Sequence, residues 1–247
     1  MGLVNVRDGM MCLGPALLGV VTLWPVVGAV LPQAMGIALS PVPMICIVLV
    51  LLSSGPIRAG LSFFLGWAAA LAIATGLVVV LTDAVAEEGS EGARDGVDIV
   101  ELAIGVVFAV LAVRYWRKRP RPGEPPPRPA IVDKITTLSG PALLLTGAGA
   151  ALANVKNLPL VIGAGTQIGG SPLTVGEQFA AAALFVVAAS LTVLLPLLAV
   201  IIAGPRRSAP ALSSLEQWLL ANLNTILVVL LAVLSAVLIG QGLDLFR

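Results

Sequence analysis

Six long apolar stretches follow one another along this chain, and they limit its possible folds more than any other feature. A helix needs about 20 mostly apolar residues to cross the hydrocarbon core of a bilayer. The chain supplies such stretches at about 34–53, 59–82, 99–116, 138–165, 178–203 and 219–241. Because 58% of the residues are hydrophobic and only 11% are charged, a soluble domain could not bury them all. The sequence predicts an all-α membrane protein with about six transmembrane helices.

The spacing of these stretches divides the chain into two three-helix halves, 34–116 and 138–247, joined by a basic, proline-rich linker at 117–137. Residues 1–33 form an apolar N-terminal extension, which we expect to lie outside the membrane and to lead into the first span. Part of it is apolar enough to cross, so a seventh span and the apolar region of a signal peptide remain alternatives. Only Pro32 and Gln33 would separate such a span from the next one, which is a tight turn for two antiparallel helices.

Basic residues gather in the loops that follow the first, third and fifth spans. Ten of the fourteen lie there: Arg58, Arg114, Arg117, Lys118, Arg119, Arg121, Arg128, Lys134, Arg206 and Arg207. The loop between the second and third spans is acidic instead. Cytoplasmic loops of membrane proteins carry an excess of Lys and Arg. The pattern therefore predicts a multi-pass protein with the 117–137 linker in the cytoplasm and both termini outside.

Two interruptions occupy matching places in the first span of each half. Ser40-Pro41-Val42-Pro43 breaks one span, and the segment from Asn154 to Pro159 breaks the other. The passages GIALSPVPM and AALANVKNL align Ser40 with Asn154. Because each half has three spans, the second half must enter the membrane in the opposite sense, so a true repeat would be inverted. Broken helices at mid-membrane form the binding sites of many secondary transporters.

Lys156 lies inside the second interruption, and a cation at the centre of a membrane helix usually faces a cavity or a partner. No carboxylate lies deep in another span, so the counter-charge could be an anionic substrate. The alternatives are a lysine that reaches a nearby interface and prolines that only kink the helices. The candidate substrate-binding residues are Ser40, Pro41, Pro43, Asn154, Lys156, Asn157 and Pro159.

Other kinds of site find little support in the residue types. The chain has no histidine and only two cysteines, Cys12 and Cys46, so the usual zinc and haem ligands cannot be assembled. It also has no nucleophile–base pair and no phosphate-binding glycine loop. We expect no enzyme activity, no cofactor, no metal and no nucleic-acid partner.

Three passages carry a resemblance to a known family: LPQAMGIALSPVPMICIVLVLLSS at 31–54, PIRAGLSFFLGW at 56–67 and ALANVKNLPL at 151–160. The chain resembles the LysE superfamily of six-helix exporters, and within it the GAP branch of peptidoglycolipid- or sulfolipid-addressing proteins. The third passage is similar to the branch's Asn-Pro-Lys-Asn signature, with Val155 in place of the proline. The resemblance covers about residues 26–243.

The resemblance implies a transporter in the plasma membrane of a bacterium, with an envelope glycolipid or its anionic precursor as substrate. Membrane lipid would be its main partner, as substrate and as environment. An exporter of an amino acid or another small solute is one alternative, because the same residues would attract it. A second is a non-transporting scaffold that binds envelope-lipid export machinery through the 117–137 linker.

Overall fold

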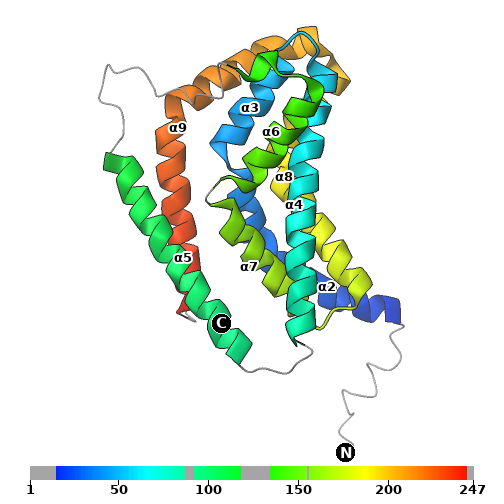
Figure 1. Ribbon diagram of the computed structural model, residues 1–247, viewed down its shortest axis with the longest axis vertical. Helices are drawn as coiled ribbons and strands as arrows, with labels where there is room; N and C mark the ends of the chain where they lie inside the picture. The colour runs from blue at the N-terminus through cyan, green and yellow to red at the C-terminus, as the bar shows by residue number, and fades with distance from the viewer. Residues whose placement is uncertain (1–14, 87–91, 118–133, 155, 244–247) are drawn as a thin grey trace, which may run out of the picture.

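The computed structural model describes residues 15–86, 92–117, 134–154 and 156–243, and all regular structure in these ranges is helical (Figure 1). The long helices are α2 (Pro15–Ala38), α4 (Pro56–Ala86), α5 (Gly92–Arg117), α8 (Val175–Ala203) and α9 (Pro205–Gly242). The short ones are α3 (Pro41–Leu51), α6 (Gly140–Leu152), α7 (Asn157–Gly169) and a 3-10 helix, η1 (Ile135–Thr137). The all-α prediction is confirmed for these parts of the chain.

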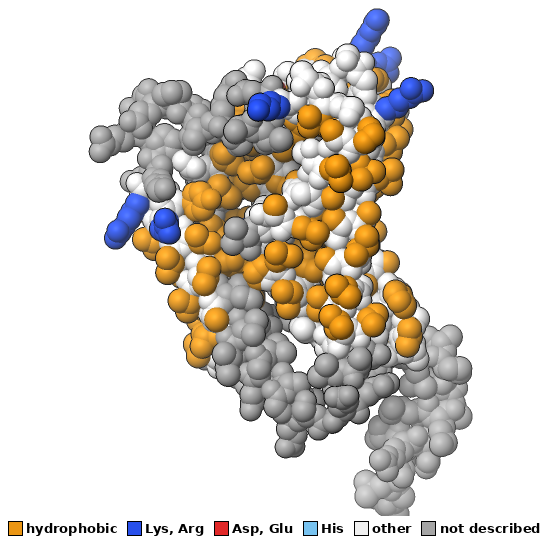
Figure 2. All heavy atoms as spheres, in the orientation of Figure 1, with side chains coloured by type: hydrophobic (Ala, Val, Ile, Leu, Met, Phe, Trp, Pro, Cys, Tyr) orange, Lys and Arg blue, Asp and Glu red, His pale blue; other side chains and the backbone are white. Residues whose placement is uncertain are grey.

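Within the described parts of the chain, three helices are long and apolar enough to cross a membrane: Pro56–Thr82, Val175–Ala203 and Pro205–Gly240. A fourth crossing results if α2 and α3, which meet at an angle of 59°, form one broken span. Figure 2 shows an apolar surface over the middle of the visible face. Lys and Arg side chains lie at the upper end of this face and near the end of α5. The chain is therefore a multi-pass membrane protein by composition and by the distribution of its charges.

Helix α2 begins well before residue 34, where the first predicted span starts. It begins at Pro15 within the described residues and continues through Pro25 and Pro32 to Ala38. The described part of the N-terminal extension is therefore helical and continuous with the residues that lead to the first break. No turn separates them at Pro32 and Gln33. Residues 1–14, the rest of the extension, lie outside the described residues.

Two sets of helices make up the molecule. In the larger set, α4 packs against α6 and α7, while α8 packs against α2, α3 and α4. Glycines allow α4 and α6 to approach closely, since a Cβ atom at Gly147 would lie 2.1 Å from the backbone oxygen of Phe63. The second set is the pair α5 and α9, which pack mainly against each other. Ser235 on α9 donates a hydrogen bond of 2.8 Å to the backbone oxygen of Gly105 on α5.

Both predicted helix breaks are present. The first lies at Leu39 and Ser40, between α2 and α3, and the second lies between Leu152 and Asn157, where α6 ends and α7 begins. Figure 1 shows both breaks about halfway along the molecule, with α3 and α6 above them and α2 and α7 below. They are close in space, because Ser40 Oγ donates a hydrogen bond of 3.4 Å to Asn157 Oδ1.

Candidate functional site

The first break follows from the two prolines that begin α3. Pro41 and Pro43 have no N–H group, so they cannot continue the hydrogen-bond ladder of α2. The backbone N–H of Ser40 bonds instead to the oxygen of Ile37 at 3.1 Å, and its hydroxyl donates to the same oxygen at 2.7 Å. Thr192 of α8 donates to the oxygen of Ala38. The C-terminal carbonyls of α2 are thus bonded mostly by side chains.

Lys156 bonds to the end of α2. Its side chain is 3% exposed, and its Nζ donates to the backbone oxygen of Gly36 and to Asn157 Oδ1 at 3.3 Å. A cation is favourable at a helix C-terminus, where the backbone carbonyls concentrate negative partial charge. The parts of the chain that the structure describes contain no ion pair to Lys156. Since an ammonium has three N–H donors and two are used here, one remains for a ligand.

Asn157 holds the two breaks together. It is fully buried, and its Nδ2 donates to the backbone oxygen of Ala151 at 2.9 Å. Its Oδ1 accepts the hydrogen bonds from Ser40 and Lys156. Both ends of the amide are therefore used within the protein. This asparagine fixes the geometry of the site and leaves ligand contacts to its neighbours.

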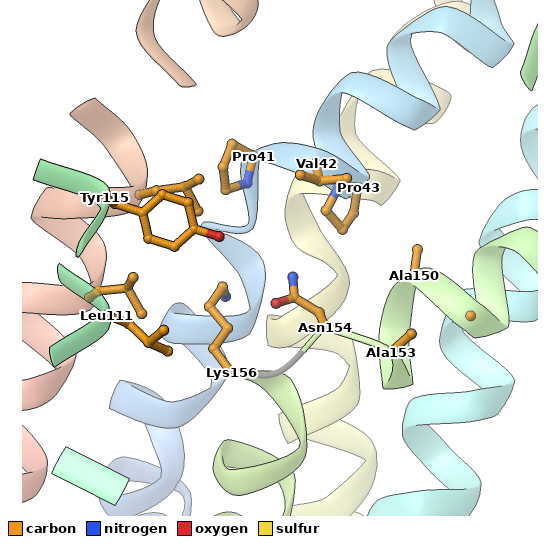
Figure 3. Close-up of a pocket in the computed structure, with 12 residues that line it drawn as sticks. Pro41, Val42, Pro43, Leu111, Tyr115, Ala150, Ala153, Asn154 and Lys156 are labelled. Atoms are coloured by element: carbon orange, nitrogen blue, oxygen red, sulfur yellow. The ribbon is translucent and has the colours of Figure 1, made fainter. Parts of the chain in front are cut away.

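A cavity of about 400 Å³ opens beside the two breaks (Figure 3). Its lining consists of Pro41, Val42, Pro43, Leu111, Tyr115, Gly149, Ala150, Ala153, Asn154, Lys156, Leu227 and Leu231. The structure thus brings four of the predicted site residues to one cavity, namely Pro41, Pro43, Asn154 and Lys156. Ser40 and Asn157 lie behind this lining and position it, while Pro159, which is half-buried in the first turn of α7, is not part of it.

The polar groups of the cavity converge from two walls. Figure 3 shows the amide of Asn154 and the end of Lys156 on one side and the hydroxyl of Tyr115 on the other, directed into the same space. Tyr115 lies on α5 and was not among the predicted site residues. Its position beside Trp116 in the basic last turn of α5 is typical of an aromatic residue at a membrane interface. The sequence offered no signal that placed its hydroxyl opposite Lys156.

The remaining lining is apolar, with Leu111 from α5 and Leu227 and Leu231 from α9. Among the described residues that line this cavity, none is acidic. One cation and one amide therefore face a wall of leucines that carries one hydroxyl, an arrangement that suits an anion attached to an apolar group. Within the described ranges, no group of three or more His, Cys, Asp or Glu residues could hold a metal ion.

Three comparisons with known proteins give one match, to a family model. A search of curated proteins finds no match, and a search of solved structures finds none either. A family model described as Sap, sulfolipid-1-addressing protein, matches residues 30–244, which is most of the chain and includes both helix breaks. The match confirms the branch that the three sequence passages indicate. The chain belongs to the family of the Sap, sulfolipid-1-addressing protein.

Proposed function

We propose that this protein is a transporter that moves an anionic envelope lipid, or the anionic precursor of one, across the membrane through the cavity beside Lys156. The observation that carries the proposal is the buried ammonium group, which has no carboxylate partner among the described residues and faces a cavity. The family description points the same way, because it connects the chain with the delivery of a sulfolipid.

Burial of the Lys156 charge has a free-energy cost that an anionic ligand would offset. A lysine at the centre of a membrane helix costs about 2.5–3.5 kcal/mol on insertion scales. The carbonyl of Gly36 and the amide of Asn157 offset part of this cost, but neither carries a full charge. A sulfate, phosphate or carboxylate group would complete the pairing with a charge-assisted hydrogen bond. An anion is therefore the ligand that the cavity favours most.

The leucine wall of the cavity favours an amphiphile over a small solute. Leu111, Leu227 and Leu231 offer apolar contacts that an amino acid or an inorganic anion would not need. A cavity of about 400 Å³ suits a head group better than an entire acylated lipid. The acyl chains would extend from the cavity into the surrounding bilayer while the head group moves past Lys156. This is the reason to prefer an envelope lipid to the export of an amino acid.

Six crossings arranged as two inverted halves would place this cavity near the bilayer midplane. The helix contacts support such a repeat, because the second helix of each half packs on the broken helix pair of the other half. Helix α4 packs on the broken pair α6 and α7, whereas its counterpart α8 packs on the broken pair α2 and α3. The third helices of the halves, α5 and α9, pack on each other. A two-fold axis in the membrane plane would produce this pattern, as in other transporters with inverted repeats.

The basic residues supply the orientation. Arg58, Lys134, Arg206 and Arg207 lie where α4, η1 and α9 begin, and these starts would share one side if the spans alternate in direction. We name this side the basic end. The positive-inside rule then puts the basic end and the 117–137 linker in the cytoplasm of a bacterium, with both termini outside. We retain the LysE superfamily as the wider group of exporters.

Replacement of Lys156 with glutamine tests the proposal directly. The variant keeps a long polar side chain but removes the charge, and we expect lipid delivery to the outer face to fall at least about tenfold, since a charge-assisted hydrogen bond contributes roughly 1.5–3 kcal/mol. Lipid extracted from the cell surface is quantified by mass spectrometry at equal protein abundance. Lys134→Gln is the matched control, because this lysine is exposed at the basic end. Normal surface lipid in Lys156→Gln cells would overturn the proposal.

A further inference from the structure

Of the residues that the structure describes, Tyr115 supplies the one hydrogen-bonding side chain on the wall of the cavity that α5 and α9 form. The other lining residues of this wall are Leu111, Leu227 and Leu231. Figure 3 shows the tyrosine ring extending from α5, with its hydroxyl pointing into the cavity across from Lys156. Among the described residues, the hydroxyl makes no hydrogen bond to the protein. A phenol hydroxyl can both donate and accept, so it is available to a ligand.

The two walls belong to different sets of helices. Lys156 and Asn154 lie at the break between α6 and α7, whereas Tyr115 lies on the α5–α9 pair, which packs mainly on itself and contacts the other helices chiefly where α9 meets α3. A ligand held by both walls would therefore connect the two sets. The anion would bind at Lys156, and the bond to Tyr115 would require a second polar group on the ligand, separate from the anion.

We propose that Tyr115 is a specificity-determining residue, which selects head groups that carry a hydroxyl in addition to the anionic group. An anion alone, such as a simple alkyl phosphodiester, would satisfy Lys156 and leave Tyr115 and Asn154 without partners. A hydroxylated head group would satisfy all three side chains. A polar group that a bound ligand covers without bonding to it is costly, and a site built to bond a hydroxyl therefore rejects a ligand that lacks one. This inference rests on the proposed function and adds a second selection to it.

Position and exposure distinguish Tyr115 from an ordinary interface aromatic. Trp116, the next residue, is 54% exposed and does not line the cavity. Tyr115 is 38% exposed, and its polar end is the part that enters the cavity. An interface aromatic directs its polar end toward the aqueous boundary. The orientation of Tyr115 toward Lys156 favours contact with a ligand.

The test uses three lipids with identical acyl chains. Phosphatidylglycerol has an anion and hydroxyls, phosphatidylmethanol has the same phosphodiester anion without hydroxyls, and phosphatidylcholine is zwitterionic. The full-length protein is reconstituted in vesicles that contain equal amounts of the three, then purified again. Mass spectrometry measures the lipid that the protein retains. We expect the wild-type protein to retain phosphatidylglycerol most and phosphatidylcholine least.

Two variants separate the inference from the proposed function. In Tyr115→Phe, which keeps the ring, we expect the preference for phosphatidylglycerol over phosphatidylmethanol to shrink to the part that Asn154 supplies, and both lipids still to be retained above phosphatidylcholine. In Lys156→Gln, we expect the preference for the two anionic lipids to disappear. Thr146→Val is the control, because it removes a hydroxyl that bonds to its own helix at the oxygen of Ala142, outside the cavity lining.

Failure of the inference and failure of the proposed function would appear in different variants. If Tyr115→Phe keeps the wild-type preference for phosphatidylglycerol over phosphatidylmethanol, the role of Tyr115 is overturned while the proposed function stands. If Lys156→Gln keeps the preference for anionic lipid, the proposed function fails. If the wild-type protein does not distinguish the two anionic lipids, hydroxyl selection is absent and the inference is wrong. Thermal unfolding of Tyr115→Phe, compared with wild type, checks that the phenol has no structural role.

Discussion

At the scale of residues, two asparagines in one segment have different environments. Asn157 is fully buried and uses its whole amide to join Ser40, Ala151 and Lys156. Asn154 is half-buried and directs its amide into the cavity. The first residue sets the relative position of the two helix breaks. The second is available to a ligand, together with Lys156.

Asn154→Asp introduces a carboxylate into the cavity without changing the size of the side chain. The new charge would attract Lys156 and repel an anionic ligand, so we expect lipid delivery to fall about tenfold or more, as a charge-assisted bond to the ligand is lost. Stability should be retained, because the buried ammonium gains a partner. Surface-lipid extraction and thermal unfolding measure the two effects. Asn154→Ser, which adds no charge, is the control and should lose much less delivery.

An unchanged rate in Asn154→Asp would mean that the ligand does not approach this amide. A collapse of the folded state would instead mean that Asn154 has a structural role like that of Asn157. The sequence could not assign these two roles. Both asparagines are polar residues in an apolar stretch, and their difference depends on contacts with Ser40, 117 residues away along the chain. Tyr115 was missed for the same reason, since only the tertiary structure brings α5 to the cavity.

At the scale of elements, the helix breaks were predictable because their cause is local. Two prolines within three residues, at Pro41 and Pro43, and a cluster of polar residues, around Asn154, each favour a break in a helix. The second break lies upstream of Pro159, which occupies the first turn of α7, where the missing N–H group costs little. The extent of α2 was less predictable, because a helix can continue through Pro25 and Pro32 in a membrane protein when neighbouring groups bond the freed carbonyls.

Close packing of α4 on α6 gives a stability test for the element that ends at the second break. In Gly147→Ala, the new methyl group would lie 2.1 Å from the oxygen of Phe63, so the helices must separate. We expect the variant to lose about 1–3 kcal/mol of stability, the usual effect of overpacking. Gly149→Ala in the same helix is the matched control, because a Cβ there meets no atom within 4 Å. Alanine also favours the helix by up to about 1 kcal/mol.

Thermal unfolding in detergent compares these two variants with the wild-type protein. The expected order places Gly147→Ala below wild type and Gly149→Ala at or above it. Equal transitions for the two variants would show that α4 and α6 do not need close contact. Since α6 carries Gly149, Ala150 and the approach to Asn154, a shift of this helix would also widen the cavity. Lipid delivery should therefore fall in Gly147→Ala at temperatures where the protein is still folded.

At the scale of the whole molecule, the α5–α9 pair and the remaining helices enclose the cavity between them. Apolar composition predicted the membrane class, but it could not predict which helices would form each wall. That choice depends on contacts such as the hydrogen bond from Ser235 to the backbone oxygen of Gly105, which a serine or threonine on many helix pairs could make. The α5–α9 pair contacts the other helices mainly where α9 packs on α3. A ligand that bonds to both walls would add a second connection between the two sets of helices.

Helices α6 and α7 form either one broken span or a re-entrant pair that returns to the same side. The second half can be an inverted copy of the first only if they form a broken span. Thr136 precedes α6 and Pro172 follows α7, and both are exposed. In a background with Cys12→Ser and Cys46→Ala, we introduce Thr136→Cys or Pro172→Cys and label right-side-out vesicles with a membrane-impermeant maleimide. A broken span puts the two positions on opposite sides. With the basic end in the cytoplasm, Pro172→Cys should react and Thr136→Cys should react only after the vesicles are opened.

The reverse pattern would keep the crossing and invert the orientation, which would place both termini in the cytoplasm. Reaction of both cysteines from one side would instead make α6 and α7 a re-entrant pair and exclude the inverted repeat. Ser54→Cys, in the exposed turn between α3 and α4, provides an internal standard, because two crossings separate it from Thr136 if α4 and α5 both span the membrane. It should therefore be labelled under the same conditions as Thr136→Cys. If all three cysteines react as expected, the α2–α3 pair and the α6–α7 pair cross the membrane in opposite directions, as an inverted repeat requires.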